Sequence, residues 1–254
     1  MIDTHTHLYL PEYGEEVKKI IEDCTKTGVN HLILPNIDLE SINHLKNFHL
    51  LYPYITSMAM GLHPTEVKDD WEKTLNVIEN EIKTGEYKAI GEVGIDLYWD
   101  DQHKKDQIRV FELQLQMAEK YNLPVIIHSR NAYKETVEVI SKVKPNVPLI
   151  FHSFTGSKED VKTIRQICDP YFGINGVVTY KNAKDLREAL PLITLERIIL
   201  ETDSPYLTPV PHRGKKNNSS YLCYIRDKVA DILRVTTNAI ESKTDSNACA
   251  IFGL

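Results

Sequence analysis

Residues 16–35 of the 254-residue chain read EVKKIIEDCTKTGVNHLILP and contain the pattern that decides the fold. Apolar residues recur there at the i, i+3, i+4 and i+7 spacing of one helix face, at Val17, Ile20, Ile21 and Cys24. Gly28 is a residue type that ends helices, and residues 31–35 (HLILP) are a short apolar run typical of a buried strand. The segment therefore predicts an amphipathic helix that leads into a buried strand.

The same alternation continues on both sides of this segment. Further strands are predicted near residues 1–3, 55–60, 88–91, 124–127, 148–151, 171–174 and 197–200. Further helices are predicted near residues 39–52, 71–84, 105–120, 133–142, 158–167, 184–190 and 220–234, with a last short helix near 238–251. Strict alternation predicts a parallel sheet covered by helices. About eight units in this length favour an α/β fold of one domain, residues 1–254, closed as a (β/α)8 TIM barrel.

Composition narrows the function classes. No apolar stretch approaches membrane-spanning length, so we expect no membrane partner. The four cysteines are scattered without a Cys-x-x-Cys pair, and the first ten residues lack the apolar run of a signal peptide, so we expect a cytoplasmic protein. The net charge of −6 argues against a broad nucleic-acid-binding face, because such faces neutralise phosphates. It leaves open a local site that grips one phosphodiester.

Polar residues follow the predicted strands at the points where these strands end. They are His5, His7, Glu92, His128, His152 and Asp203. In a parallel barrel all these positions lie on the carboxyl-terminal rim, where barrel enzymes place their active sites. A single histidine at a strand end is more often a hydrogen-bonding residue, and Glu92 or Asp203 alone could cap a helix or a turn. The conjunction of six such residues on one rim predicts a metal site instead.

The residue types indicate which ions the site binds. Imidazole and carboxylate together suit Zn²⁺, Mn²⁺ or similar cations, and one ion needs about four such ligands. Six candidates therefore predict two divalent metal ions (Mg, Mn or Zn), with Glu92 central enough to bridge them. Such a pair lowers the pKa of a shared water. We expect a metal-dependent hydrolase in which Asp203 both ligates a metal and takes the water proton.

Several nearby residues are candidates for supporting roles. His63, in Gly-Leu-His-Pro, follows a strand and is expected to contact substrate or to serve only as a turn residue. Arg130 follows His128 by two residues and could bind an anion or pair with a helix acid. Glu201 is expected to orient a ligating histidine, as such carboxylates commonly do. Asp96 is expected to be a turn or cap residue.

The longest irregular stretch, residues 204–219, contains a basic group in an acidic chain. Because this stretch follows the strand that supplies Asp203, it is expected to hang over the metal site. We expect Arg213 to clamp a phosphate, since its planar guanidinium matches two phosphate oxygens, with His212 as a further donor. The alternative is a solvated surface turn.

The motifs together resemble the TatD family of metal-dependent deoxyribonucleases. The matching segments are DTHTHL (3–8), GLHP (61–64), AIGEVGID (89–96), LPVIIHSR (123–130), HSFTG (152–156), LETDSPYL (200–207), TPVPHRG (208–214) and the closing FG (252–253). They run nearly from end to end in the right order. The chain departs from the family at Asn131, where Asp is usual, and near residues 218–220, where Glu-Pro-Ala is usual. Neither departure affects an expected ligand.

The resemblance implies a (β/α)8 fold, divalent metals and hydrolysis of DNA phosphodiesters by a metal-bound hydroxide, often as a 3′→5′ exonuclease. By matching motif, it assigns as ligands the same six residues reached above. We expect single-stranded or frayed DNA ends as substrate, because a barrel mouth is narrow. The main alternative is an amide or ester hydrolase such as an aminoacyl-tRNA deacylase, since the same metals polarise carbonyls. A catalytically silent binding scaffold would not need the intact ligand set.

Overall fold

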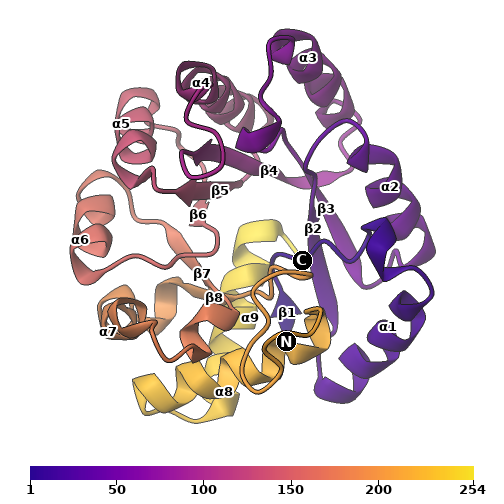
Figure 1. Ribbon diagram of the computed structural model, residues 1–254, viewed down its shortest axis with the longest axis vertical. Helices are drawn as coiled ribbons and strands as arrows, with labels where there is room; N and C mark the ends of the chain where they lie inside the picture. Colours follow the sequence, from indigo (N-terminus) through magenta and orange to yellow (C-terminus); the bar gives the residue numbers. More distant parts are fainter.

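A computed structural model describes residues 1–254, and its strands all run parallel in one sheet, in the order β1 to β8 (Figure 1). The strands are β1 (Ile2–Asp3), β2 (His31–Pro35), β3 (Thr56–Met60), β4 (Tyr87–Asp96), β5 (Val125–Arg130), β6 (Leu149–Phe151), β7 (Tyr171–Ile174) and β8 (Ile198–Leu200). The predicted parallel sheet is therefore confirmed.

Helices follow the strands, and all of them but the last form an outer ring around the sheet (Figure 1). They are α1 (Glu16–Thr27), α2 (Ser41–Leu51), α3 (Trp71–Ile82), α4 (Lys104–Tyr121), α5 (Tyr133–Val143), α6 (Lys158–Ile167), α7 (Lys184–Ile193), α8 (Leu222–Leu233) and α9 (Thr237–Phe252). In α1, Ile20 and Cys24 are buried against the sheet, and Gly28 ends the helix in the left-handed conformation. None of the helices combines the length and the apolar character needed to cross a bilayer.

Hydrogen bonds between the first and last strands nearly close the sheet into a barrel. The amide of Thr4 donates to the Leu200 carbonyl at 3.0 Å, and the amide of Asp203 donates to the His5 carbonyl at 2.9 Å. An isolated parallel bridge between Thr6 and Ser204 continues the contact. The result is a TIM-barrel-like fold, as predicted, and its seam lies beside the first candidate ligands.

Alternation along the strands separates an inner layer of side chains from an outer one. On β5, Ile126 belongs to a small buried cluster inside the barrel, while Val125 and Ile127 pack with the surrounding helices. The inner cluster comprises Ile2, Ile33, Ala59, Ala89, Ile126, Ile150 and Ile199 from the strands, with Ala248, Ile251 and Phe252 from α9. Helix α9 crosses the ring of strands and closes its amino-terminal end (Figure 1). We call this cluster the apolar plug.

Two elements differ from their predicted lengths. The last helix spans Thr237–Phe252, one residue longer at each end than predicted, and the apolar residues near its carboxyl end fill the end of the barrel. Strand β4 continues to Asp96, five residues beyond the predicted end. Its register against β5 shifts between Ile90 and Val93, so the simple alternation that marks a strand in the sequence is interrupted there.

Candidate metal centre

Every second side chain of a strand points into the barrel. This alternation continues beyond the apolar plug to the carboxyl-terminal rim, where the inward side chains are polar. On β5 the inner side chain Ile126 is followed two residues later by His128, and on β6 Ile150 is followed by His152. Beyond β8, Ile199 is followed in the same way by Glu201. Because side chains alternate along a strand, these polar groups project into the barrel above the plug.

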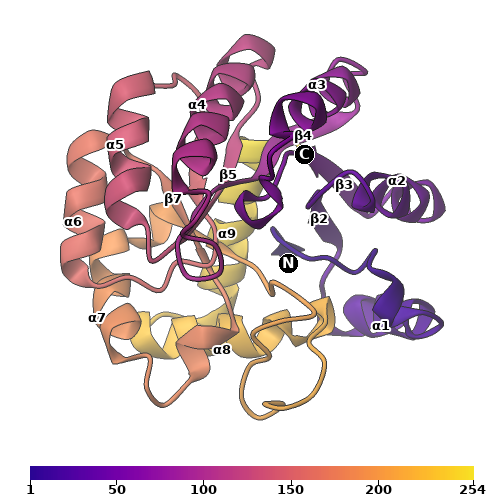
Figure 2. The ribbon, with the colours of Figure 1, turned by 45° about the horizontal axis from the view of Figure 1, so that its top comes forward.

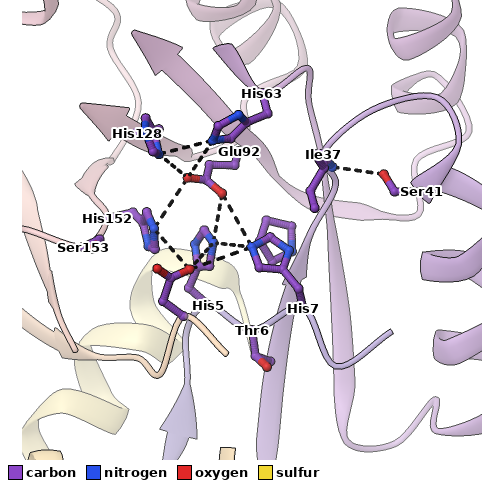
Figure 3. A network of polar contacts seen from close by, with 12 residues as sticks. His5, Thr6, His7, Ile37, Ser41, His63, Glu92, His128, His152 and Ser153 are labelled. Carbon is purple, nitrogen blue, oxygen red and sulfur yellow. Dashed lines mark hydrogen bonds and ion pairs between the residues drawn. The ribbon is translucent and has the colours of Figure 1, made fainter. Parts of the chain in front are cut away.

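Glu92 lies at the centre of the polar cluster and is 3% exposed. Its Oε2 atom lies 3.1 Å from His5 Nε2 and 3.7 Å from His7 Nε2. Its Oε1 atom lies 2.7 Å from His128 Nδ1 and 3.5 Å from His152 Nε2 (Figure 3). The two carboxylate oxygens thus face two different pairs of histidines.

Asp203 joins this cluster from the loop after β8. Its Oδ1 atom lies 3.8 Å from His5 Nε2, 3.9 Å from His7 Nε2 and 3.7 Å from His152 Nε2. The rings of His5 and His152 stack with their centroids 3.5 Å apart. The structure therefore brings together all six residues that the sequence pattern selected, counting His128 and Glu92 above.

The spacing of these atoms fits a divalent cation. Nitrogen and oxygen ligands bind such ions at about 2.0–2.2 Å, so two ligands of one ion lie roughly 3.0–3.5 Å apart. The Nε2 atoms of His5 and His7 are 3.1 Å apart, and both approach Glu92. Two groups of three candidate ligands share this carboxylate: His5, His7 and Glu92, and His63, Glu92 and His128. The cluster is thus a donor set suited to one or more cations.

The histidines of the cluster differ in the direction in which their pKa is shifted. Burial lowers the pKa of His7 to about 4 and that of His5 well below its usual range, so both imidazoles are neutral and offer lone pairs. Burial acts in the same direction on His128, but hydrogen bonds to Asp96 and Glu92 raise its pKa to about 9. A cation that binds there would have to displace a proton, because metal ligation requires neutral imidazole.

Asp96 holds His128 from the side opposite to Glu92. One carboxylate oxygen of Asp96 accepts hydrogen bonds from the amides of Tyr98 and Trp99, both at 2.9 Å, which is the turn role expected from sequence. The other oxygen lies 2.9 Å from His128 Nε2, a contact that the sequence interpretation missed. Spacing gave no usable signal for this contact, because the register shift in β4 interrupts the alternation of the strand before Asp96.

Glu201, which the sequence pattern selected as an orienting carboxylate, lies beside His152. Its Oε1 atom lies 2.9 Å from His152 Nδ1, although the angle there departs from hydrogen-bond geometry, and it accepts a hydrogen bond from the Ser153 amide at 2.6 Å. A Cβ atom at Gly173 would lie 2.2 Å from the Glu201 carboxylate. Only glycine at position 173 leaves room for this buried acid inside the barrel.

His63 reaches deeper into the cluster than a residue that only contacts substrate. Its Nε2 atom lies 3.3 Å from His128 Nδ1 and 3.6 Å from Glu92 Oε1 (Figure 3). The amide of Thr65 donates to His63 Nδ1, so the neutral ring carries its proton on Nε2. In this form His63 presents an N–H, and not a lone pair, to the cluster.

A cavity of about 750 Å³ opens from the cluster to solvent. Its walls include the candidate ligands His7, Glu92, His128, His152 and Asp203, together with His63, Trp99, Arg130 and Tyr206. Arg130 is exposed, and its guanidinium carbon lies 4.1 Å from the ring centroid of Tyr98. Of the candidate phosphate-binding cations, Arg130 is the one that the structure brings to this cavity.

The other candidate contacts, His212 and Arg213, do not line the cavity. His212 stacks on Tyr221 with ring centroids 4.3 Å apart. Arg213 is exposed, and its guanidinium carbon lies 3.8 Å from the ring centroid of Tyr180. The long loop after β8 lies on a different side of the barrel mouth from the loop after β4 (Figures 1 and 2). None of the basic residues of the β8 loop borders the cavity.

Comparisons with known proteins agree with this arrangement. The sequence model of the family described as TatD related DNase matches residues 2–253. YabD of Bacillus subtilis, described as an uncharacterized metal-dependent hydrolase, is 34% identical over 255 residues, which cover 99% of this chain and 98% of that protein. An uncharacterized metal-dependent hydrolase of Mycoplasma pneumoniae is 31% identical over 257 residues, 98% of each chain.

Solved structures extend the similarity of fold. The crystal structure of YJJV, a TatD homologue from Escherichia coli K12, has a TM-score of 0.93 at 24% identity and covers 100% of this chain and 98% of its own. A TatD family hydrolase from Entamoeba histolytica has a TM-score of 0.85 at 19% identity, covering 99% of this chain and 97% of its own. The match to the family model over almost the whole length decides the assignment. The chain belongs to the TatD-related DNase family and is a metal-dependent hydrolase.

Proposed function

We propose that this protein is a deoxyribonuclease that uses two divalent cations to hydrolyse phosphodiester bonds at the 3′ ends of single-stranded or frayed DNA. The observation that carries the proposal is the convergence of four imidazoles and one aspartate around Glu92 at the base of an open cavity. Membership of the TatD-related DNase family supports DNA as the substrate class.

The proposed ligands are His5, His7, Glu92, His128, His152 and Asp203, which would hold Mg²⁺, Mn²⁺ or Zn²⁺. Glu92 is suited to lie between two ions because its oxygens face different histidines. When bound, such ions lower the pKa of water and offset the negative charge that develops on the phosphoryl group.

The side chains around this centre have separate roles in proton transfer, in orienting the ligands and in binding the substrate. Asp203 Oδ1 lies near three histidines and borders the cavity, so it is the group that takes the proton of the attacking water. Asp96 and Glu201 hold His128 and His152 in place from behind. Arg130 holds a phosphate of the substrate strand at the cavity wall.

The shape and charge of the molecule favour chain ends over duplex interiors. The net charge of −6 gives no broad surface for a phosphate backbone, and the cavity has one arginine in its wall. A strand end can enter a cavity of about 750 Å³, whereas an intact duplex would need a basic face to bind. The proposal therefore predicts slow cutting of closed circular duplex DNA.

The test compares substrates with the same metal-free protein after addition of Mg²⁺, Mn²⁺ or Zn²⁺. We expect stepwise shortening of single-stranded oligonucleotides labelled at the 5′ end, with no turnover in excess chelator. A thiophosphate link at the 3′ end should block the reaction and one at the 5′ end should not. Faster hydrolysis of aminoacyl-tRNA or of model esters would show instead that the protein is a deacylase or esterase.

A further inference from the structure

Two large aromatic side chains stand exposed at the cavity mouth, in the loop between β4 and α4. Trp99 is 68% exposed and lines the cavity, and its neighbour Tyr98 is 55% exposed. Their rings are nearly perpendicular, at 87°, with centroids 4.9 Å apart. Exposed aromatic side chains beside a polar cavity are typical of binding sites, because a ligand covers the apolar faces of the rings and its polar groups enter the cavity.

Arg130 occupies the corner that these two rings form. Its guanidinium carbon lies 4.1 Å from the Tyr98 centroid and 5.4 Å from the Trp99 centroid. Other cations nearby are paired with acids, as Lys104 is with Glu135, but Arg130 has no acidic partner. The ring of Tyr98 therefore supports the arginine from one side, while the N–H groups of Arg130 remain free for an anion.

The loop that carries the rings is fixed before any ligand arrives. The amides of Tyr98 and Trp99 donate to Asp96, whose other oxygen contacts His128 of the candidate metal centre. The buried side chain of Gln107 bonds both the Asp96 amide, at 2.8 Å, and the Asp100 carbonyl, at 2.7 Å. A loop held at both ends loses little entropy when a ligand binds, so the exposed rings are preorganised.

We infer that Trp99, Tyr98 and Arg130 form a subsite that binds one unpaired nucleotide of the DNA strand, with its base stacked on Trp99 and its phosphate held by Arg130. This subsite rests on the proposed function and adds to it which part of the DNA strand binds at the cavity mouth. Every base has a π face, so the subsite accepts all four bases. It requires an unstacked base, which a strand end supplies and a duplex interior does not.

The kinetic test uses a pair of variants and a pair of substrates. Trp99→Ala should raise KM for a single-stranded oligonucleotide about five- to hundredfold with little change in kcat, and Trp99→Phe should retain most of the affinity. The effect should disappear on an oligonucleotide whose last three 3′ nucleotides are abasic. Tyr54→Ala is the control, because Tyr54 is 95% exposed in the loop before β3, at the other end of the barrel.

A binding test separates this inference from the proposed activity. The chain has two tryptophans, so Trp71→Phe leaves Trp99 as the single tryptophan, whose fluorescence can be excited apart from that of the tyrosines. A metal-loaded Trp71→Phe protein titrated with a thiophosphate-linked (dT)6 strand should lose fluorescence as a base stacks on Trp99. Quenching without cleavage of ordinary DNA would support the subsite and overturn the proposed activity. Normal cleavage with no quenching, or an equal loss by Trp99→Ala on the abasic substrate, would overturn the subsite.

Discussion

Ile150 and His152 are two residues apart on the same strand end, and both side chains point into the barrel. Ile150 packs in the apolar plug together with Ile126, Ile199 and residues of α9. His152 lies among carboxylates, with its Nε2 atom 3.5 Å from Glu92. One barrel thus contains an apolar layer and a charged layer separated by a single alternation of the strand.

The two layers contribute to stability in different ways. Burial of the plug removes apolar surface from water and stabilises the fold. Burial of the rim carboxylates costs free energy unless each charge has a partner, and it raises the pKa of Asp203 to about 7. We therefore expect substitutions in the plug to lower stability with little effect on chemistry, and substitutions on the rim to act mainly on the chemistry.

The largest effect is expected from Glu92→Gln. The amide keeps the shape of the side chain but removes the charge that faces both pairs of histidines. We expect kcat for DNA hydrolysis to fall about a thousandfold or more with the fold retained. Tm should fall, because burial opposes the charge of Glu92 but the neighbouring histidines hold its pKa well below the usual range, so the charge stabilises the folded state at neutral pH. Initial rates with saturating metal, together with circular dichroism, measure both quantities.

Glu112→Gln is the matched control for this substitution. Glu112 is also a buried glutamate, but it lies on α4 and pairs with Lys142 and Arg109 outside the barrel. Its loss should leave kcat within about twofold of the wild type, since exposed partners make such pairs weak. Comparable activity in the two variants would mean that Glu92 has no special place in the reaction.

The next largest effect is expected from Ile150→Ala in the plug. Ile150 is 1% exposed, so the substitution leaves a cavity directly below the rim. We expect a loss of about 2–5 kcal/mol in the free energy of unfolding, and a loss of about 0.5–1.5 kcal/mol for Ile150→Val. Urea denaturation measures both values. If kcat per folded molecule fell as much as in Glu92→Gln, the two layers would not be separable.

Asp203→Asn tests whether the rim destabilises the metal-free fold. Burial raises the pKa of Asp203, so between about pH 4 and pH 7 the folded state keeps a proton that the unfolded chain releases. Stability therefore falls as pH rises through this window. Above about pH 7 the metal-free variant should have a Tm a few degrees higher than the metal-free wild type, and the difference should vanish below about pH 4. A lower Tm for the variant throughout would show that Asp203 stabilises the fold.

The rim residues could be predicted from the sequence because they follow apolar runs that are easy to recognise. The apolar runs before His128 and before His152 are continuous, so the next inward position could be counted. In β4 the register shift between Ile90 and Val93 hides the continuation of the strand. Glu92 consequently lies within a strand and not after it, and the role of Asp96 could not be counted from alternation alone.

Loop residues were harder to place because no periodicity fixes the direction of their side chains. The sequence showed that residues 211–216 are basic, but not that Lys216 bonds Glu16 or that Arg213 packs on Tyr180. Similarly, Tyr98 and Trp99 had no signal in the sequence beyond their residue types. Their exposure and their contact with Arg130 became visible only when two loops after neighbouring strands were placed together.

The smallest effect is expected at Arg213, which the sequence pattern selected as a phosphate clamp. Its guanidinium rests on Tyr180 beside the cavity and not in its wall, so it can reach only a phosphate outside the site. Arg213→Ala should raise KM for DNA a few-fold and reduce the slope of log KM against log salt by about one, because one phosphate contact is lost. Arg130→Ala, measured in the same salt series, should raise KM more, since Arg130 lines the cavity. Parallel curves with unchanged KM for Arg213→Ala would mean that the loop is a solvated surface turn, and a larger effect than Arg130→Ala would mean that the DNA strand leaves the cavity across the β8 side of the barrel.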